Sequence, residues 1–497
     1  MDIKSLQPAE VWRFFYEITQ IPHGSGNLKQ IGNYLETFAR ERSLPVRRDT
    51  YGNILISKDG TAGYEDHPVV ILQGHMDMVA VKDPGVAKDL LTEGLDVETD
   101  GEEVWARGTS LGGDDGIAVA YCLAILDANN IPHPPLEILI TTDEETGMDG
   151  ARGVDLSETR GQCLINIDNE KEGVLLTSCA GGARFHASIP APRRLPAGTG
   201  EGVPAEVRTE YVLTIDGLLG GHSGEMIIKG RANACVLMGR VLRRLSEELE
   251  EGFLVRSLTG GAADNAIPVS CSARVTLTEA AMVPAEEMIR VLQEELRGEY
   301  GVQDPGLSVS LSRVEVAEEK TAEPLTAAAL SRIAHYLTVM PNGVQAMSAL
   351  VPNLVETSLN LGILRLTEEG DRLEADYSVR SSRDSAKEEL LTRLRLMTER
   401  FEGSYDISGV YPGWAYREES PLRDTMKRVY TELYGQEPQM VAIHAGVECG
   451  LLSAKRPGLD CISIGPDMRD IHTTGEHLSV ASSRRTWEYL LAVLAAL

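Results

Sequence analysis

The stretch VVILQGHMDMVA, residues 69–80, is informative about both fold and chemistry, because a mostly apolar run passes directly into groups that prefer water, protons or metal. The run has the length and composition of a strand buried on both faces of a sheet. His75 and Asp77 follow it at once. A buried strand that ends in an imidazole and a carboxylate indicates chemistry at its carboxyl end.

Similar polar groups recur elsewhere in the chain, either after strand-like segments or at the start of a helix. They are Glu144 and Glu145 after LEILITTD, Asp168 in CLINIDNE, His472 after the run in LDCISIGPDMRDIH, and Asp114 and Asp115 in SLGGDDGIAVA. Each has an ordinary structural interpretation when taken alone, for example an aspartate that caps a helix. Together they predict one site, since the carboxyl ends of strands in an α/β sheet meet at the same edge.

The order of the segments predicts an α/β fold interrupted by an insertion. Extended and helical patterns alternate at first, with helices expected near residues 27–44 and 116–130. A Pro/Gly-rich stretch near residues 190–204 then leads into alternating strands and long helices. We therefore expect a catalytic domain, with a mixed sheet between helices, that is split by an inserted α+β domain. The predicted domains are residues 1–183, 184–403 and 404–497.

Composition excludes several classes of protein. The 497 residues carry a net charge of −28, which repels phosphate and disfavours nucleic acid as a partner. The first residues read as an amphipathic helix and not as a signal peptide, and no apolar run is long enough for a membrane span. Seven scattered cysteines without a CxxC pair are typical of reduced thiols. We expect a cytoplasmic protein.

Several carboxylates at one sheet edge repel each other and require a positive charge. No run of Lys or Arg lies near them in the sequence, and two of the ten histidines do. A pair of divalent metal ions with one bridging carboxylate satisfies this requirement. Mixed imidazole and carboxylate ligands favour two zinc ions, with manganese or cobalt as substitutes. The predicted ligands are His75, Asp114, Glu145, Asp168 and His472, although spacing alone does not separate Asp114 from Asp115.

Two acids remain outside this ligand set. Asp77 lies on the same side of an extended chain as His75 and is expected to accept the second imidazole N–H. Glu144 is expected to be the general base that takes a proton from a water between the metals and passes it to the leaving amine.

The motifs GHMDMV, GDDGIAVA, DEETGMDGA, LINIDNE, GGHSG, NAIP and HAGVECG resemble those of dinuclear zinc peptidases related to aminoacylase and glutamate carboxypeptidase. The resemblance is greatest to the aminoacyl-histidine dipeptidase branch and extends from about residue 8 to the C-terminus. It implies a zinc-peptidase-type catalytic domain whose inserted domain is a lid and a dimerisation surface. It also implies that Asp114 bridges, that His75 and Asp168 hold one metal, and that Glu145 and His472 hold the other.

The resemblance assigns further residues, each of which also has an ordinary structural explanation on sequence alone. His222 in GGHSG matches a lid histidine that stabilises the oxyanion, and Asn265 matches a residue that contacts substrate. Arg380 matches a residue suited to gripping a terminal carboxylate. His444 and Glu448 in IHAGVECG are expected to contact the substrate amine or the leaving side chain.

The predicted function is metal-dependent hydrolysis of small dipeptides such as Xaa-His, of the β-Ala-His type, by a homodimer. The same machinery would serve an N-acyl amino acid amidohydrolase, which is the alternative among enzymes. A catalytically silent metal-binding or scaffolding protein is a third hypothesis. The presence of Glu144 disfavours it, because a non-catalytic site has no use for an unliganded base.

Overall fold

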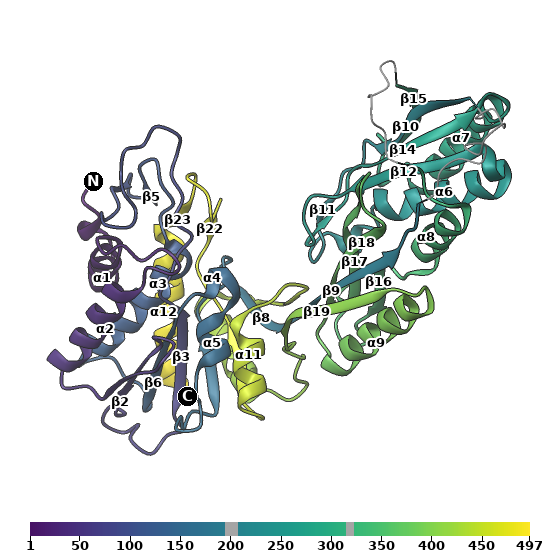
Figure 1. Cartoon of the computed structure of the whole chain (residues 1–497). Coiled ribbons are helices and arrows are strands. Elements are labelled where there is room, and N and C mark those ends of the chain that lie inside the picture. Colours follow the sequence, from purple (N-terminus) through teal and green to yellow (C-terminus); the bar gives the residue numbers. More distant parts are fainter. Residues whose placement is uncertain (194–206, 315–322) are drawn as a thin grey trace. The chain divides into compact units, whose positions relative to one another are not determined.

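The computed structural model describes residues 1–193, 207–314 and 323–497. These residues form two compact units (Figure 1). The first unit comprises Met1–Cys179, Trp414–Ala442 and Val447–Leu497, and the second comprises Ala180–Gly413 and Ile443–Gly446. Most of the Pro/Gly-rich stretch predicted near residues 190–204 lies outside the described residues.

The predicted boundary at residues 403 and 404 lies ten residues before the boundary in the structure. Strand β19 (Ser404–Tyr411) pairs with β9 (Gly181–Pro190) and therefore belongs to the sheet of the second unit. The prediction placed this segment in the catalytic domain. It could not detect the pairing, because the partner strand lies more than two hundred residues earlier in the chain.

The main sheet of the first unit has eight strands in the order β1-β2-β6-β3-β7-β21-β8-β20. Their bounds are β1 Val46–Arg48, β2 Ile54–Lys58, β3 Val70–His75, β6 Leu136–Thr141, β7 Cys163–Asn166, β8 Val174–Cys179, β20 Gln439–Ile443 and β21 Asp460–Ser463. Strands β6, β3, β7 and β21 are mutually parallel, so their carboxyl ends lie at one edge. Every residue of β3 and β6 is buried, as expected for strands covered on both faces.

Helices of the first unit pack on this sheet, with α3 against β3 and α11 against β21. Their bounds are α1 Ala9–Thr19, α2 Lys29–Glu41, α3 Gly113–Asp127, α4 Glu144–Gly147, α5 Asp149–Gly153, α10 Pro421–Tyr434, α11 Glu448–Lys455 and α12 Val480–Ala496, with a short 3-10 helix η1 at Ile3–Ser5. Helix α3 is apolar on all sides and almost wholly buried, which explains its central place. It ends at Asp127, earlier than predicted, and Asp127 forms ion pairs with Arg13 and Arg42.

A small four-stranded sheet completes the first unit, in the order β22-β23-β5-β4. Its strands are β4 Val97–Thr99, β5 Glu103–Ala106, β22 Met468–Arg469 and β23 His477–Ser479. His472 lies in the loop between β22 and β23, and not directly after a strand of the main sheet as the sequence suggested. None of the helices in the described ranges has the length and apolar character needed to cross a bilayer.

The second unit is built on a nine-stranded sheet in the order β15-β10-β14-β12-β17-β18-β9-β19, with β16 also paired to β17, and on a two-stranded ribbon of β11 and β13. The bounds not yet given are β10 Arg208–Asp216, β11 Gly221–His222, β12 Phe253–Gly260, β13 Ala266–Ile267, β14 Cys271–Thr278, β15 Ser308–Arg313, β16 Gly343–Met347, β17 Val355–Leu366 and β18 Arg372–Ser381. Buried and less buried residues alternate along β10 and along much of β18, which is typical of an antiparallel sheet covered mainly on one face.

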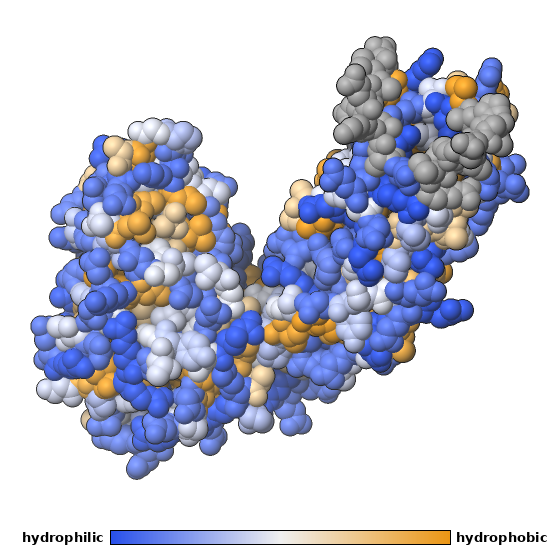
Figure 2. Space-filling view, viewed as in Figure 1, coloured by the Kyte–Doolittle hydropathy of each residue, from blue (hydrophilic) through white to orange (hydrophobic). Residues whose placement is uncertain are grey.

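The helices of the second unit supply that cover (Figure 1). They are α6 Ala234–Leu249, α7 Glu279–Tyr300, α8 Ala327–Val339 and α9 Asp384–Arg400, with 3-10 helices η2 Ile227–Lys229 and η3 Glu250–Gly252. Each unit has its own hydrophobic core. Hydrophilic residues predominate on the face of each unit seen in Figure 2, in keeping with the strongly acidic composition.

Candidate metal centre

His75 is the last residue of β3 and lies at the carboxyl edge of the parallel strands, with 1% of its surface exposed. Its Nδ1 lies 2.9 Å from the backbone carbonyl oxygen of Asp77, which can only accept a hydrogen bond. Nδ1 therefore carries a proton, and Nε2 is the ring nitrogen that would bind a metal. Nε2 faces the carboxylates of Asp114 and Asp168, at 3.0 and 3.6 Å.

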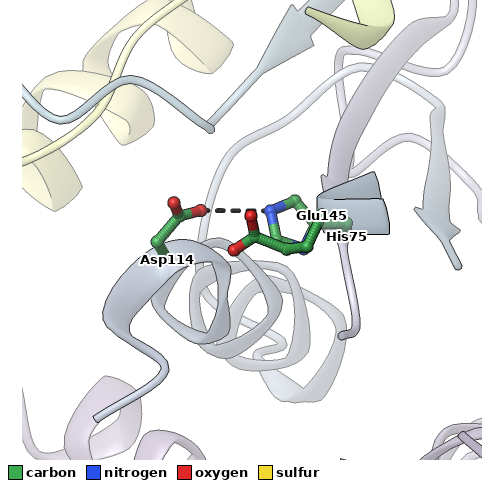
Figure 3. Close-up of side chains that lie close together, drawn as sticks. All are labelled: His75, Asp114 and Glu145. Atoms are coloured by element: carbon green, nitrogen blue, oxygen red, sulfur yellow. Dashed lines mark hydrogen bonds and ion pairs between the residues drawn. The ribbon is translucent and has the colours of Figure 1, made fainter. Parts of the chain in front are cut away.

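Asp114 lies between two histidines at the start of α3. Its Oδ1 is 3.0 Å from Nε2 of His75, and its Oδ2 is 3.2 Å from Nε2 of His472. Glu145, in the short helix α4, places Oε1 3.0 Å from the same nitrogen of His472. Figure 3 shows His75, Asp114 and Glu145 converging from three different elements. One carboxylate thus faces two imidazoles, and each imidazole has a second carboxylate beside it.

The side chains fit divalent cations in number, chemistry and charge. Ligand atoms of His75, Asp114 and Glu145 lie within 4.8 Å of one another, and those of His75, Asp115 and Asp168 form a second such group. Among the described residues, no Lys or Arg forms an ion pair with Asp114, Glu145 or Asp168. A buried cluster of acids without a Lys or Arg partner favours a bound cation, and imidazole with carboxylate suits zinc and related metals.

Burial and the close approach of these charged groups shift the pKa values of the cluster. Burial raises the pKa of Asp168 to about 7, and burial together with repulsion from Asp168 raises the pKa of Glu144 well above its usual range. Hydrogen bonds to Asp114 and Glu145 raise the pKa of His472 to about 10. Burial acts to lower the pKa of His75, but its carboxylate neighbours outweigh burial and raise it. The carboxylates thus favour the protonated form of both imidazoles.

Asp77 organises two parts of the site. The sequence predicted that the Asp77 carboxylate accepts the second imidazole N–H of His75. In the structure its Oδ1 lies 3.5 Å from Nδ1 of His75, and the backbone carbonyl of Asp77 makes the closer contact instead. The carboxylate accepts hydrogen bonds from the backbone N–H groups of Glu144 and Glu145, at 3.0 and 3.3 Å, and from the Ser25 hydroxyl at 2.9 Å. Asp77 therefore fixes the start of α4, which carries both glutamates.

Asp115 makes its hydrogen bond to the backbone of His75 and has no hydrogen bond to either histidine ring among the described residues. Its Oδ2 accepts the backbone N–H of His75 at 3.1 Å, and it is fully buried. A Cβ atom at Gly74 would lie 2.4 Å from that oxygen and 2.7 Å from the Cβ of Ala118, so the strand and helix approach this closely only because residue 74 is glycine. Burial raises the pKa of Asp115 well above its usual range.

Glu476 is a residue of this centre that the sequence analysis missed. Its carboxylate is 3% exposed and accepts hydrogen bonds from the backbone N–H groups of Leu111, Gly112 and Gly113, at 2.7, 3.1 and 2.8 Å. These residues immediately precede Asp114, and Glu476 lies four positions after His472. One carboxylate therefore ties together the two loops that carry Asp114 and His472. The available signal in the sequence was an acidic residue four positions after a predicted ligand.

Glu448 is fully buried at the start of α11, where its Oε2 accepts hydrogen bonds from Gln73 at 2.5 Å and Thr141 at 2.7 Å. Gln73 in turn accepts from Asn166 at 2.7 Å. Thr141 and Asn166 are the last residues of β6 and β7, and Gln73 lies two residues before the end of β3. Burial raises the pKa of Glu448 to about 7.

The remaining predicted residues belong to the second unit. His222 ends β11 and Asn265 directly precedes β13, and the backbone N–H of Ser223 donates to the carbonyl of Asn265 at 2.8 Å. His444 is buried, and its Nε2 lies 2.7 Å from the Ser358 hydroxyl. Burial and the charge of Arg380 lower the pKa of both His222 and His444, in the latter to about 3, so both imidazoles are neutral near pH 7.

Arg380 lies near the end of β18 and has no carboxylate partner among the described residues. Its Nη1 donates to the Tyr411 hydroxyl at 3.3 Å, and its Nε is buried without a hydrogen-bond partner. An unpaired guanidinium is unusual in a chain with 75 acidic residues. With two neutral histidines nearby, it provides positive charge suited to an anionic group.

Fold and site together define a metal-dependent hydrolase. The chain belongs to peptidase family M20/M25/M40, whose model matches residues 71–496. It is 35% identical over 493 residues to a cytosol non-specific dipeptidase of Escherichia coli (strain K12), covering 99% of this chain and 98% of that protein.

Comparison with solved structures agrees with this family. The chain is similar to an aminoacylhistidine dipeptidase from Vibrio alginolyticus, with a TM-score of 0.92, 34% identity and coverage of 100% and 98% of the two chains. The fold, at 16% identity, is also that of the aminopeptidase PepT from Bacillus cereus, with a TM-score of 0.61 and 99% of both chains covered. These comparisons confirm the predicted class of enzyme and its fold.

Proposed function

We propose that the protein is a dipeptidase that hydrolyses small dipeptides, including those with a C-terminal histidine, at a centre of two divalent cations. The observation that carries this proposal is the position of Asp114, whose two oxygens each face a different histidine. The similarity to two dipeptidases along nearly the whole chain supports the substrate class.

For the cations, we propose that His75 and Asp168 hold one, that Glu145 and His472 hold the other, and that Asp114 is shared. Asp115 is less suited to the shared position, because its Oδ2 accepts the N–H of His75. Zinc is the proposed metal, with manganese or cobalt as substitutes. When bound, two such ions polarise a carbonyl and lower the pKa of water.

Glu144 is the proposed general base. It lies beside the proposed ligand Glu145 in α4, and no ion pair engages its carboxylate among the described residues. Asp77 fixes the backbone of Glu144 through a hydrogen bond of 3.0 Å, so the base starts from a defined position. The carboxylate takes a proton from the attacking water and returns it to the leaving amine.

The second unit contributes residues for the ends of the substrate in this proposal. Arg380 binds the terminal carboxylate of the dipeptide, supported by its lack of an acidic partner. His222, neutral near pH 7, donates an N–H to the carbonyl oxygen as negative charge develops there. Asn265 contacts the substrate from its position just before β13, next to the residue paired with His222.

His444 and Glu448 take supporting places. We propose that His444 lines the carboxylate site, since its Nε2 lies 2.7 Å from the hydroxyl of Ser358, the residue opposite Arg380 on the neighbouring strand. Glu448 is fully buried and already bonded to Gln73 and Thr141, which favours support of the strand ends over direct contact with substrate.

A substrate panel tests the function. We expect the zinc-loaded protein to cleave β-Ala-His, Gly-His and Leu-Gly, and to lose this activity on chelation and regain it with zinc. Cleavage of N-acetyl amino acids with no cleavage of the dipeptides would instead indicate the amidohydrolase. Bound metal without turnover of any amide would indicate a metal-binding or scaffolding protein.

We further propose a homodimer that forms through the second unit, and a cytoplasmic location. The E. coli relative is named a cytosolic dipeptidase, and all seven cysteines are free thiols in the structure. Strand β19 lies at the edge of its sheet and is exposed along most of its length. An exposed edge strand of this kind can pair with a second chain. Light scattering coupled to size-exclusion chromatography tests the dimer, and a monomer at all concentrations would refute it.

A further inference from the structure

Four residues on neighbouring strands of the second unit form one row across the sheet, here called the Arg380 row. Ser358 of β17 is opposite Arg380 of β18, Arg380 is opposite Gly182 of β9, and Gly182 is opposite Tyr411 of β19. Residues directly opposite each other in antiparallel strands project on the same face of the sheet. The row therefore gathers a hydroxyl, a guanidinium and a phenol at one place.

An irregularity in β19 brings Tyr411 into this row. Ser408 is opposite Arg184, so a regular ladder would place Val410 opposite Gly182. The register shifts between Ser408 and Tyr411, and the extra residue puts Tyr411 there instead. Bulges of this kind redirect a side chain and are common beside functional sites.

Gly182 leaves the space that Tyr411 occupies. A Cβ atom on Gly182 would lie 2.5 to 2.6 Å from the ring and hydroxyl of Tyr411. Because that atom is absent, the ring lies over the glycine and its hydroxyl reaches Nη1 of Arg380, two strands away, at 3.3 Å. The backbone of Tyr411 is also held, since Nζ of the buried Lys387 donates to its carbonyl at 2.5 Å and to Asp384 at 2.8 Å.

Among the described residues, the side chain of Arg380 donates a single hydrogen bond, and its acceptor is the Tyr411 hydroxyl. On the other side of the row, the hydroxyl of Ser358 is engaged by His444. A long, unpaired arginine side chain loses much of its rotamer freedom when it binds an anion, and an anchor already in place reduces that cost. Tyr411 supplies such an anchor.

We propose that Tyr411 is a positioning residue that holds the guanidinium of Arg380 in place for the C-terminal carboxylate of the substrate. This inference rests on the proposed role of Arg380 in dipeptide hydrolysis. Through Arg380, Tyr411 would then contribute to the preference of the enzyme for substrates with a free C-terminal carboxylate over those with a neutral C-terminus. A tyrosine that only stabilised the edge of the sheet would have no such effect.

The test compares Leu-Gly with its C-terminal amide in the metal-loaded wild type and in Tyr411→Phe, which keeps the ring and removes the hydroxyl. The wild type is expected to prefer the free acid. In Tyr411→Phe, KM for the acid should rise about 3- to 10-fold, the factor for one lost hydrogen bond, with little change in kcat. The acid-over-amide preference should fall by the same factor. Tyr405→Phe, another tyrosine of β19, is the matched control and should retain the preference.

The double variant with Arg380→Met shows whether Tyr411 acts through the arginine. Once Arg380 is replaced, Tyr411→Phe should have no further effect on KM for the acid. Gly182→Ala offers a second route, because it displaces the Tyr411 ring without altering Arg380, and should lower the same preference.

Two failures are distinguishable. If the wild type prefers the acid but Tyr411→Phe keeps that preference, or loses activity equally on both substrates, the role of Tyr411 is wrong and the proposed function stands. Additive effects of Tyr411→Phe and Arg380→Met would lead to the same conclusion. If the wild type cleaves acid and amide equally well, the proposed carboxylate site at Arg380 is itself wrong, and the inference falls with it.

Discussion

The carboxylate of Asp77 accepts a hydrogen bond from the backbone N–H of Glu144, with an Oδ1 to N distance of 3.0 Å. The same carboxylate lies beside His75, so one side chain connects the end of β3 to the start of α4. The proposed ligand His75 and the proposed base Glu144 are therefore positioned by a shared neighbour. This arrangement explains why a buried strand ends in a histidine followed two residues later by an aspartate.

Replacing Asp77 should disturb both partners at once. We expect Asp77→Ala to lower metal affinity or kcat by about 10- to 100-fold, the usual effect of removing a residue that orients a ligand. Metal titration and steady-state kinetics measure the two effects. Asp100→Ala is a suitable control, because Asp100 also accepts two backbone N–H groups but lies exposed and away from the cluster. Equal losses in both variants would show that Asp77 has no special role.

The two adjacent aspartates should respond differently to the same change. In Asp115→Asn the amide oxygen can still accept the N–H of His75, so activity should change by less than about threefold. Asp114→Asn replaces the carboxylate that faces both histidines and should lower activity by at least about 10²-fold with loss of bound metal. Metal analysis and kinetics on both variants check this, and the opposite order of effects would make Asp115 the bridging residue.

Glu476 should affect metal binding and not only folding. In Glu476→Gln the side chain keeps one acceptor oxygen for three backbone N–H groups, so the loops that carry Asp114 and His472 should loosen. We expect metal affinity to fall about 10- to 100-fold, and stability to fall by about 1–3 kcal/mol.

A matched control exists for that variant. Glu137 is also 3% exposed and accepts backbone N–H groups, from Arg160 and Gly161, but it lies near the amino end of β6. Glu137→Gln should lower stability without changing metal affinity. Competition with a colorimetric chelator measures the metal affinity. The same affinity for wild type and Glu476→Gln would show that the hydrogen bonds of Glu476 serve stability alone.

His444 should make the second unit less stable in mild acid. Burial and the charge of Arg380 lower its pKa to about 3 in the folded protein, against about 6.5 in the unfolded chain. The unfolded state therefore binds the proton first, and stability falls as the pH drops below about 6.5, by about 2 kcal/mol at pH 5.

His444→Gln removes this titration, so the stability difference between wild type and variant should shift in favour of the variant between pH 7 and pH 5. Hydrogen exchange of amides in β17 and β18 reports it locally. A difference that stays constant over this range would show that His444 keeps an ordinary pKa.

Much of the fold and part of the site were predictable, because parallel strands bring their carboxyl ends together. Position along the chain alone therefore indicated that His75, Glu144 and Asp168 converge. In the structure, Nε2 of His75 lies 3.6 Å from Asp168, and both residues lie close enough to Glu144 to shift its pKa. Periodicity also located helix α2, expected near residues 27–44, to within a few residues.

The rest depended on pairing between distant segments. Glu476 meets the backbone of residues 111–113 from more than 360 positions away, and no local pattern announces such a contact. Tyr411 meets Arg380 only because a register shift and a glycine on an intervening strand allow it. The choice between Asp114 and Asp115 required the direction of each side chain, which adjacent positions in a sequence do not reveal.

The proposed mechanism is tested most sharply by the turnover of Leu-Gly by Glu144→Gln, with bound metal counted in the same preparations of variant and wild type. We expect two metal ions per chain in both proteins and a loss in kcat of about 10²- to 10⁴-fold in the variant, because the proton acceptor is gone while the ligands remain. A variant that binds two ions and keeps wild-type kcat would contradict the assignment of Glu144 as the base.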